Sequence, residues 1–288
     1  MFLPRKILEE KLRAMLAEDA GQGDITTSLI VPADARAQAT VVAKQIGIVA
    51  GIEEVNIFLQ SLGLEVESSV NDGKKVRPGE VLLKISGDAR TLLTAERTLL
   101  NLLSRMSGIA TATRNLVERL KKAKVKTRVA CTRKTAPGLL YFDKKAVMIG
   151  GGDTHRLHLD DMILIKDNHV ALAGSVEKAL EKARKQASFS KKIEIEVTKT
   201  DEVLPAVRAG ADIVMLDNFS PKQLEKAMML LKREKYYGKV IVEASGGITA
   251  ENIMRFASTG VDIVSLGEIT QNPRALDVSL EITKIAKS

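Results

Sequence analysis

Charged residues and glycines follow a series of short apolar runs in the C-terminal half of the chain. The runs are residues 126–131, 162–165, 193–197, 213–216, 240–244 and 263–266. The polar residues that follow or lie within them are Thr132-Arg133-Lys134-Thr135, Lys166-Asp167-Asn168-His169, Glu194 with Glu196, Asp217-Asn218, Ser245-Gly246-Gly247 and Gly267-Glu268. The amino-terminal ends of the runs lack this pattern. Because the carboxyl ends of parallel strands meet at one edge of a sheet, these residues predict a functional site there.

The residue types indicate a site for anions and for a hard cation. Arginine pairs bidentately with carboxylates, whereas lysine acts as a point charge. The candidates for holding a multiply charged anion are Arg133, Lys134, Arg156 and Lys166. Glu196 and Asp217 offer oxygen ligands for Mg²⁺ and acceptors for sugar hydroxyls. Ser245-Gly246-Gly247 and Gly267 allow backbone N–H groups to approach a phosphate, aided by a helix expected to begin near Thr249.

The chain has three histidines, and they do not predict a zinc site. His158 and His169 lie near Asp160 and Asp161, but neither an HExxH motif nor paired cysteines accompany them. His155 follows a glycine run and precedes Arg156, so we interpret it as a polar loop residue near the bound anion.

Helical patterns separate most of the apolar runs, and this alternation is typical of a parallel sheet. Six runs fall short of the eight strands of a closed barrel, which takes about 250 residues. The sequence therefore predicts an α/β fold with an open, incomplete barrel in this half of the chain.

The N-terminal half has a different pattern of apolar and polar residues. We expect a helix over residues 1–18, a β-rich stretch over 36–86 interrupted by a helix over 52–62, and a long helix over 91–123. One face of the long helix carries Arg97, Asn101, Ser104, Arg105 and Gly108, because their spacing repeats with the helical period. A solvated helix face is the ordinary explanation for such a stripe.

The amino-acid composition limits the classes of partner that the chain can bind. The formal net charge is +8, which suits anionic ligands, but aromatic residues make up only 3% and tryptophan is absent, so the stacking platforms of nucleic-acid binders are missing. We expect no nucleic-acid partner. The chain has no long apolar run and no signal-peptide core, so we expect no membrane association and a cytoplasmic location. The single cysteine, Cys131, is expected to be buried and inert.

Several strings in this order and spacing resemble quinolinate phosphoribosyltransferases, also called nicotinate-nucleotide pyrophosphorylases (carboxylating). The resemblance runs from Glu18-Asp19 to the C-terminal residues. The strings are ERTLLNLLSRMSGIAT (96–111), TRKTAPGL (132–139), GGGDTHRLHLDDMILIKDNH (150–169), EIEV (194–197), ADIVMLDNF (211–219), EASGGIT (243–249) and DIVSLGEIT (262–270).

The resemblance implies an N-terminal α/β sandwich domain over residues 1–112 and an open α/β barrel over residues 113–272. A C-terminal helix, about 273–288, would pack on the first domain. It also implies a homodimer with shared active sites, with further assembly left open, in which Arg97 reaches the partner's site. The residues implied to hold the quinolinate carboxylates are Arg133, His155, Arg156 and Lys166.

The same resemblance assigns a second group of residues to phosphoribosyl pyrophosphate and Mg²⁺. Those facing the sugar diphosphate and the metal would be Lys134, Glu196 and Asp217. Those receiving the 5-phosphate would be Ser245, Gly246, Gly247 and Gly267. The implied reaction forms nicotinate mononucleotide, pyrophosphate and CO₂ in the de novo synthesis of NAD.

The chain departs from the usual family pattern at Leu140, Asp143, Thr154 and His158, and none of these changes removes a charge named above. Two alternatives stay open. One is a related phosphoribosyltransferase that acts on another acid or serves a metal-uptake operon. The other is a binding module, because residues 68–88 resemble biotinyl and lipoyl carriers, although the lysine turn of those carriers is missing.

Overall fold

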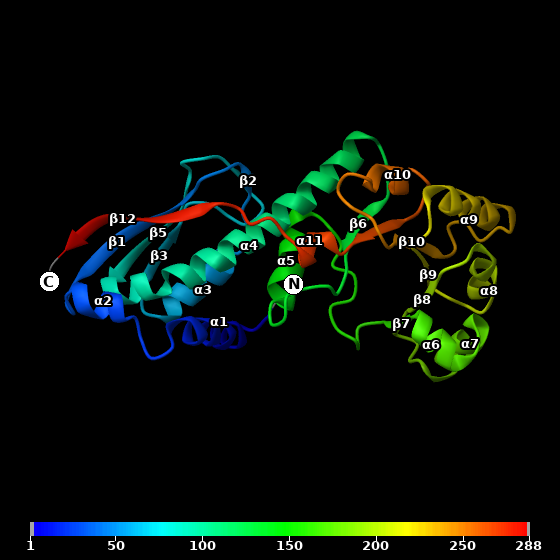
Figure 1. The fold of residues 1–288 in the computed structure, drawn as a ribbon, viewed down its shortest axis with the longest axis horizontal. Coiled ribbons are helices and arrows are strands. Elements are labelled where there is room, and N and C mark those ends of the chain that lie inside the picture. The colour runs from blue at the N-terminus through cyan, green and yellow to red at the C-terminus, as the bar shows by residue number, and fades with distance from the viewer. Residues whose placement is uncertain (1–2, 287–288) are drawn as a thin grey trace. The chain divides into compact units, whose positions relative to one another are not determined.

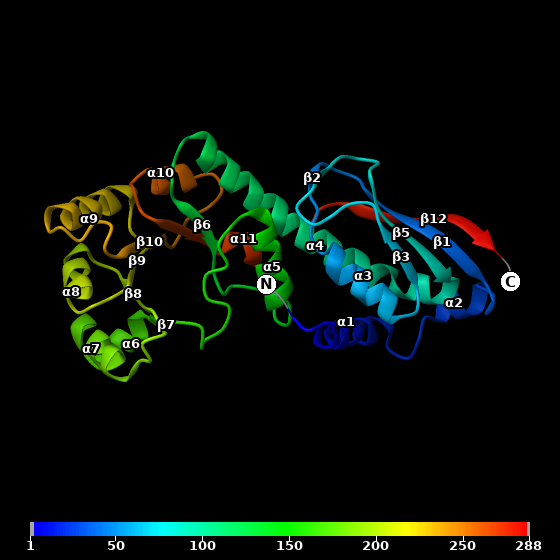
Figure 2. The ribbon, with the colours of Figure 1, turned by 180° about the vertical axis from the view of Figure 1, so that it is seen from behind.

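The computed structural model describes residues 3–286, which form two compact units. Unit 1 comprises residues 3–114, 148–151 and 273–286, and unit 2 comprises residues 115–147 and 152–272. Figures 1 and 2 show the elements of both from opposite sides. No helix between residues 3 and 286 combines the length and the apolar character needed to cross a bilayer.

Unit 1 contains an antiparallel four-stranded sheet in the order β12-β1-β5-β3. The strands are β1 (Arg36–Ala43), β3 (Glu65–Ser68), β5 (Val81–Asp88) and β12 (Val278–Ala286). Alternate residues of β1, among them Ala37, Ala39 and Val41, are buried. Helices lie against one face of the sheet (Figures 1 and 2). A two-stranded ribbon pairs β2 (Gly47–Ile48) with β4 (Lys75–Val76).

Three helices of this part of the chain are close to those expected, and one was not expected. The expected helices are α1 (Arg5–Ala20), α3 (Ile52–Ser61) and α4 (Ala89–Lys122), whose last turns belong to unit 2, and the unexpected one is α2 (Ile25–Ile30). Arg97 on α4 is exposed, as a solvated face predicts. Gly108, further along the same face, is buried. A β-carbon added there would lie 2.2 Å from the backbone oxygen of Arg274, so the chain before β12 covers this end of the face.

The expectation of a C-terminal helix is wrong. Val278–Ala286 forms strand β12, which pairs antiparallel with β1 from Val278 opposite Ala43 to Ala286 opposite Arg36. Its sequence alternates apolar and polar residues at Val278, Leu280 and Ile282, and it is rich in β-branched residues, both of which favour a strand. The edge of β1 supplies the hydrogen-bonding partner, more than 200 residues away in sequence, as the bond from Thr283 Oγ1 to the Gln38 carbonyl illustrates (|i−j| = 245).

Unit 2 contains a parallel six-stranded sheet in the order β6-β11-β10-β9-β8-β7. All six predicted runs are strands. They are β6 (Arg128–Cys131), β7 (Ile163–Ile165), β8 (Ile193–Val197), β9 (Ile213–Asp217), β10 (Ile241–Ser245) and β11 (Ile263–Leu266). Although β6 and β7 are consecutive in sequence, they form opposite edges of the sheet among the described residues, so the predicted open barrel is confirmed.

Helices connect these strands. They are α5 (Leu140–Gly150), α6 (Asp167–Ala173), α7 (Val176–Gln186), the 3₁₀ turn η1 (Thr200–Glu202), α8 (Val203–Arg208), α9 (Pro221–Arg233), α10 (Ile253–Ala257) and α11 (Glu268–Gln271). The start of α9 is a capping box, in which Ser220 and Gln223 bond each other's backbone N–H groups around Pro221. Such well-capped helices return the chain to the same end of the sheet for each new strand.

Candidate active site

The strands of unit 2 present every second residue to one side of the sheet. Because side chains alternate along a strand, each of the strands β7 to β11 contributes one residue near its middle and a second at its carboxyl end. The pairs are Leu164 with Lys166, Glu194 with Glu196, Met215 with Asp217, Glu243 with Ser245, and Ser265 with Gly267. The parallel register aligns neighbours, since Met215 lies opposite both Glu196 and Glu243 and Asp217 lies opposite Ser245. The inner layer is mostly buried and the outer layer is partly exposed.

All of these residues except Glu194 line a cavity of about 580 Å³ at the carboxyl edge of the sheet. Eleven of the twelve site residues predicted from the sequence line it: Arg133, Lys134, His155, Arg156, Lys166, Glu196, Asp217, Ser245, Gly246, Gly247 and Gly267. Arg97 belongs to unit 1 and is not among the lining residues. The structure therefore brings these strand-end residues together at one cavity.

Two guanidinium groups, of Arg133 and Arg156, line this cavity and offer donors for an anion. Arg156 is only 8% exposed, and its Nε atom has no hydrogen-bond partner among the described residues. Burial, and then repulsion from Arg133, lower the pKa of Arg156. A buried donor without a partner and two neighbouring like charges are both costly. A bound carboxylate would relieve both costs, because it can accept two parallel N–H bonds from a guanidinium.

Carboxylates also line the rim of the cavity, and Glu196 is close enough to Arg156 to attract it. Glu196 forms an ion pair with Lys166, so the cation predicted for the acid substrate and the carboxylate predicted for Mg²⁺ are direct partners. Asp217 accepts a hydrogen bond of 2.7 Å from Nδ2 of Asn218. These contacts hold both carboxylates at the cavity, where their oxygens are suited to a hard cation.

A glycine turn closes another part of the cavity. Gly246 has φ +88°, and a β-carbon added there would lie 2.3 Å from Oδ1 of Asn218 and 2.7 Å from its backbone nitrogen. Only glycine fits this position. Gly247 has φ +61° but has open space around it. The helix expected near Thr249 begins later, at Ile253, and has five residues, so the turn itself is the candidate phosphate site.

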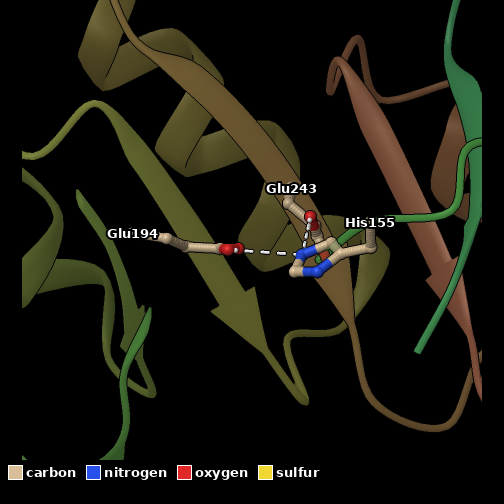
Figure 3. A group of neighbouring side chains, drawn as sticks. All are labelled: His155, Glu194 and Glu243. Carbon is tan, nitrogen blue, oxygen red and sulfur yellow. Dashed lines mark ion pairs between the residues drawn. The ribbon is translucent and has the colours of Figure 1, made fainter. Parts of the chain in front are cut away.

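The innermost charged group is a cluster that the sequence did not predict (Figure 3). Nε2 of His155 lies 3.2 Å from Oε2 of Glu194 and 3.2 Å from Oε2 of Glu243. Both carboxylates are 0% exposed. Burial lowers the pKa of His155, but its contacts with Glu194 and Glu243 outweigh burial and raise that pKa to about 10. Burial also raises the pKa of Glu194. Polar residues inside otherwise apolar strands, Glu194 in IEIEV and Glu243 in VIVEAS, were the available signal.

A second unpredicted residue, Lys144 of α5, fixes the loop that carries His155. Lys144 is fully buried, and its Nζ donates hydrogen bonds to the backbone carbonyls of Thr154 and Arg156. The backbone N–H of His155 donates to Oδ1 of Asp153 at 2.9 Å. His155 has φ +53°, a conformation that non-glycine residues adopt only when their surroundings hold them there. These contacts point the imidazole into the cavity. The departure from the family pattern at Thr154 leaves its carbonyl in this network.

Of the remaining histidines, His169 contacts the chain through its ring and His158 through its backbone. Nδ1 of His169 accepts the backbone N–H of Lys166 at 2.9 Å, which fastens the start of α6. The backbone N–H of His158 donates to Oδ2 of Asp161 at 3.0 Å. Cys131 is buried as expected, and burial raises the pKa of its thiol, so the reactive thiolate is disfavoured.

Comparisons with known proteins point to one family. Residues 24–107 match the family described as "Quinolinate phosphoribosyl transferase, N-terminal domain", and residues 109–281 match its C-terminal domain. A curated relative from Methanothermobacter thermautotrophicus, named "Probable nicotinate-nucleotide pyrophosphorylase [carboxylating]", is 45% identical over 94% of this chain and 97% of its own length. The human protein of that name, without "Probable", is 37% identical over 98% of this chain and 94% of its own length.

Solved structures agree. The nicotinate-nucleotide pyrophosphorylase from Francisella tularensis has a TM-score of 0.89 and 39% sequence identity, with 98% of both chains covered. The enzyme of the same name from Ehrlichia chaffeensis has a TM-score of 0.88 and 33% identity, covering 98% of this chain and 100% of that one.

Proposed function

Because the chain belongs to the quinolinate phosphoribosyltransferase family, we propose that it joins quinolinate to the phosphoribosyl group of 5-phosphoribosyl 1-pyrophosphate. The products are nicotinate mononucleotide, pyrophosphate and CO₂, and the reaction serves de novo NAD biosynthesis. The observation that carries the proposal is the single cavity that gathers eleven predicted site residues at one edge of the parallel sheet. Its cations suit a dicarboxylate, and its carboxylates and glycines suit a sugar diphosphate.

The quinolinate carboxylates are assigned to the cationic part of the rim. Arg156 is the principal contact, because its buried guanidinium has an unpartnered donor. Arg133 lies close enough to repel it, so one carboxylate between them would be bound by both. Lys166 and His155 complete the set. Buried cations that meet only one carboxylate would lose part of their stabilisation, and this supports selection of a dicarboxylate over a monocarboxylate.

The sugar diphosphate is assigned to the other part of the rim. Lys134 and the 245–247 turn offer positive charge and backbone N–H groups for phosphate oxygens, and Gly267 lies beside Lys134. Glu196 and Asp217 fit Mg²⁺, which proteins commonly bind through one or two carboxylates together with substrate phosphates. When bound, Mg²⁺ would offset the negative charge of the pyrophosphate group.

The chain's own residues then act by position and charge. They hold the pyridine nitrogen of quinolinate facing C1 of the ribose, so that this nitrogen forms the new bond as pyrophosphate leaves. Lys134 stabilises the charge that develops on the pyrophosphate. The ring nitrogen becomes positive, and it stabilises the carbanion left when the adjacent carboxylate departs as CO₂. A proton then replaces that carboxylate. No covalent intermediate with the protein is required, so catalysis rests on orientation and electrostatics.

Arg97 is assigned to a neighbouring subunit's site. It is exposed on α4 of unit 1, whereas the cavity is lined by unit 2. A homodimer in which each Arg97 reaches the partner's cavity gives this side chain a function, and further assembly of dimers is compatible with it. We place the enzyme in the cytoplasm, where a single buried thiol is stable without a disulfide partner.

The test is a stoichiometric assay. The full chain is incubated with quinolinate, phosphoribosyl pyrophosphate and Mg²⁺, and nicotinate mononucleotide, pyrophosphate and CO₂ are quantified. Equal amounts of the three products support the proposal, and chelation of Mg²⁺ should stop their formation. Turnover of another acid without release of CO₂ would instead identify a related phosphoribosyltransferase and overturn the assignment.

A further inference from the structure

His155, which is assigned to quinolinate, contacts two carboxylates, Glu194 and Glu243, that are more deeply buried than any residue assigned to a substrate. Glu194 extends from β8 and Glu243 from β10, on either side of β9, and the imidazole enters between them from the 153–156 loop (Figure 3). Glu194 does not line the cavity, and Glu243 lines only its floor. Neither carboxylate is exposed enough to receive an anionic substrate, and their charge would repel one.

Two buried carboxylates require a compensating charge. All four of their oxygens lack a hydrogen bond of regular geometry within residues 3–286, so the contacts with His155 at 3.2 Å are attractions between charges. A neutral imidazole would leave both carboxylates uncompensated in a medium of low dielectric constant, which is strongly unfavourable. An imidazolium halves the net charge of the cluster. Burial opposes that protonation, yet the two carboxylates prevail and raise the pKa of His155 to about 10.

The protonation state of His155 decides what its other ring nitrogen can do. Nε2 faces the two carboxylates and therefore carries a proton in either state. In a neutral ring Nδ1 would then be an acceptor, whose lone pair repels a carboxylate of the substrate. In the imidazolium, Nδ1 is a second hydrogen-bond donor and attracts the carboxylate of the substrate. Because the ring lines the cavity, this difference is presented to the bound acid.

We propose that Glu194 and Glu243 are positioning residues that hold His155 as an oriented cation at the floor of the cavity. Recognition of the substrate acid thus depends on two carboxylates that the substrate does not touch. The inference rests on the proposed function for the identity of the acid, although the geometry of the cluster is independent of it. Other charged groups near this segment are Asp153, Lys144, Arg156, Arg133 and Glu196, whereas the ion pairs of Nε2 are with Glu194 and Glu243.

Nuclear magnetic resonance of the histidine rings tests the charge directly. The full chain has three histidines, and a His155→Ala variant assigns their signals. At about pH 8, above the ordinary histidine pKa of ~6.5, both ring nitrogens of His155 should carry protons. The double variant Glu194→Gln, Glu243→Gln should convert the ring to the neutral form. A neutral His155 in the unmodified protein at this pH would overturn the proposal.

Kinetics then test the consequence for recognition. The double variant should raise KM for quinolinate at least about tenfold while changing KM for phosphoribosyl pyrophosphate less than about twofold. In the His155→Ala background, the same substitutions should add no further increase, because they act through the imidazole. An equal increase in both backgrounds would overturn the positioning role. Glu54→Gln, at a buried glutamate of α3, is the matched control and should leave both KM values unchanged.

Two further outcomes are distinguishable from these. If the unmodified protein does not turn over quinolinate, the proposed function fails, whereas the ring spectrum still measures the charge of His155. If elemental analysis of the purified full chain finds one metal ion per chain that the His155→Ala variant lacks, the three side chains are metal ligands and the proposal is overturned.

Discussion

The two sheets of this protein differ in where they place charged residues. In the parallel sheet of unit 2, all carboxyl ends meet at one edge, and the residues after β6, β7, β9 and β11 line the same cavity. In the antiparallel sheet of unit 1, neighbouring strands end at opposite edges. Its charges lie instead on an open face, as in the ion pair of Lys84 with Glu67, whose side chains are largely exposed.

Strand direction, rather than the number of charged residues, therefore decides whether functional side chains gather at one edge of a sheet. A parallel sheet brings residues together that are more than 100 positions apart in sequence, as Lys134 and Gly267 are, with the Lys134 carbonyl accepting from Thr270 at |i−j| = 136. An antiparallel pair can also join distant residues, as β1 and β12 do, but it does not bring the carboxyl ends of its strands to one edge. Substitutions in the two sheets should therefore differ greatly in effect.

The largest effects are expected at the carboxyl edge of the parallel sheet. Arg133→Ala and Asp217→Ala each remove a charged contact with substrate, which costs ~2–5 kcal/mol, or roughly 30- to 4,000-fold in kcat/KM. Titration calorimetry should separate them. Arg133→Ala should weaken quinolinate and spare phosphoribosyl pyrophosphate, and Asp217→Ala should do the reverse. The opposite partition would show that the two parts of the rim are assigned to the wrong substrates.

A comparable loss is expected for Arg97→Ala, although this residue lies outside the cavity's unit. Arg97→Ala and Lys166→Ala homodimers should each be nearly inactive. After subunit exchange, about half of the dimers pair one mutant with the other, and each has one intact site of two. About a quarter of the unmodified activity should return. If mass spectrometry verifies exchange and no activity returns, Arg97 does not act across the interface.

A smaller effect is expected in the glycine turn, where two neighbouring positions form a matched pair. Both Gly246→Ala and Gly247→Ala place a side chain at positive φ, which costs about 1–2 kcal/mol. Only Gly246→Ala also collides with Asn218. Its KM for phosphoribosyl pyrophosphate should therefore exceed that of Gly247→Ala by about tenfold or more. Equal KM values would show that the close approach at Gly246 has no bearing on the substrate.

The smallest effect is expected in the antiparallel sheet. Lys84→Ala breaks an exposed ion pair with Glu67, and such pairs contribute ~0–1 kcal/mol. Chemical denaturation should find the free energy of unfolding changed by less than about 1 kcal/mol, with kcat/KM within about twofold of the unmodified protein. A loss of activity comparable with that of Arg133→Ala would remove the contrast between the sheets.

The parallel sheet could be predicted from sequence because its strands are buried and therefore read as short apolar runs. The carboxyl ends of parallel strands lie at the same edge of the sheet. We could therefore predict that the polar residues after each run would lie close together. The C-terminal strand was not predicted because its pairing partner is β1. No residue near 278–286 indicates a partner so distant in sequence. Its period of two favours a strand, whereas the resemblance implied a helix.

The cluster of Glu194 and Glu243 around His155 could not be predicted for a different physical reason, although Glu194 lies in one of the predicted strands. Glu194 and Glu243 are flanked by isoleucine, valine and alanine, so nothing local shows that they meet over one imidazole. Lys144 lies in α5, a helix of mostly apolar residues. Its Nζ donates hydrogen bonds to backbone carbonyls of the loop that carries His155. Such contacts are fixed by tertiary structure alone. Sequence spacing predicts which residues lie at the rim of the cavity. The buried contacts beneath the rim become visible only in the folded structure.

The central claim is that the cations at this edge recognise two carboxylates on one ring. The most direct test compares initial rates with quinolinate and with nicotinate, each with saturating phosphoribosyl pyrophosphate and Mg²⁺. Nicotinate lacks the second carboxylate, so at least one buried cation loses its partner and no CO₂ can leave. Because a lost charged contact costs ~2–5 kcal/mol, kcat/KM for nicotinate should be more than about tenfold below that for quinolinate. Turnover of nicotinate within about tenfold of quinolinate would contradict this account.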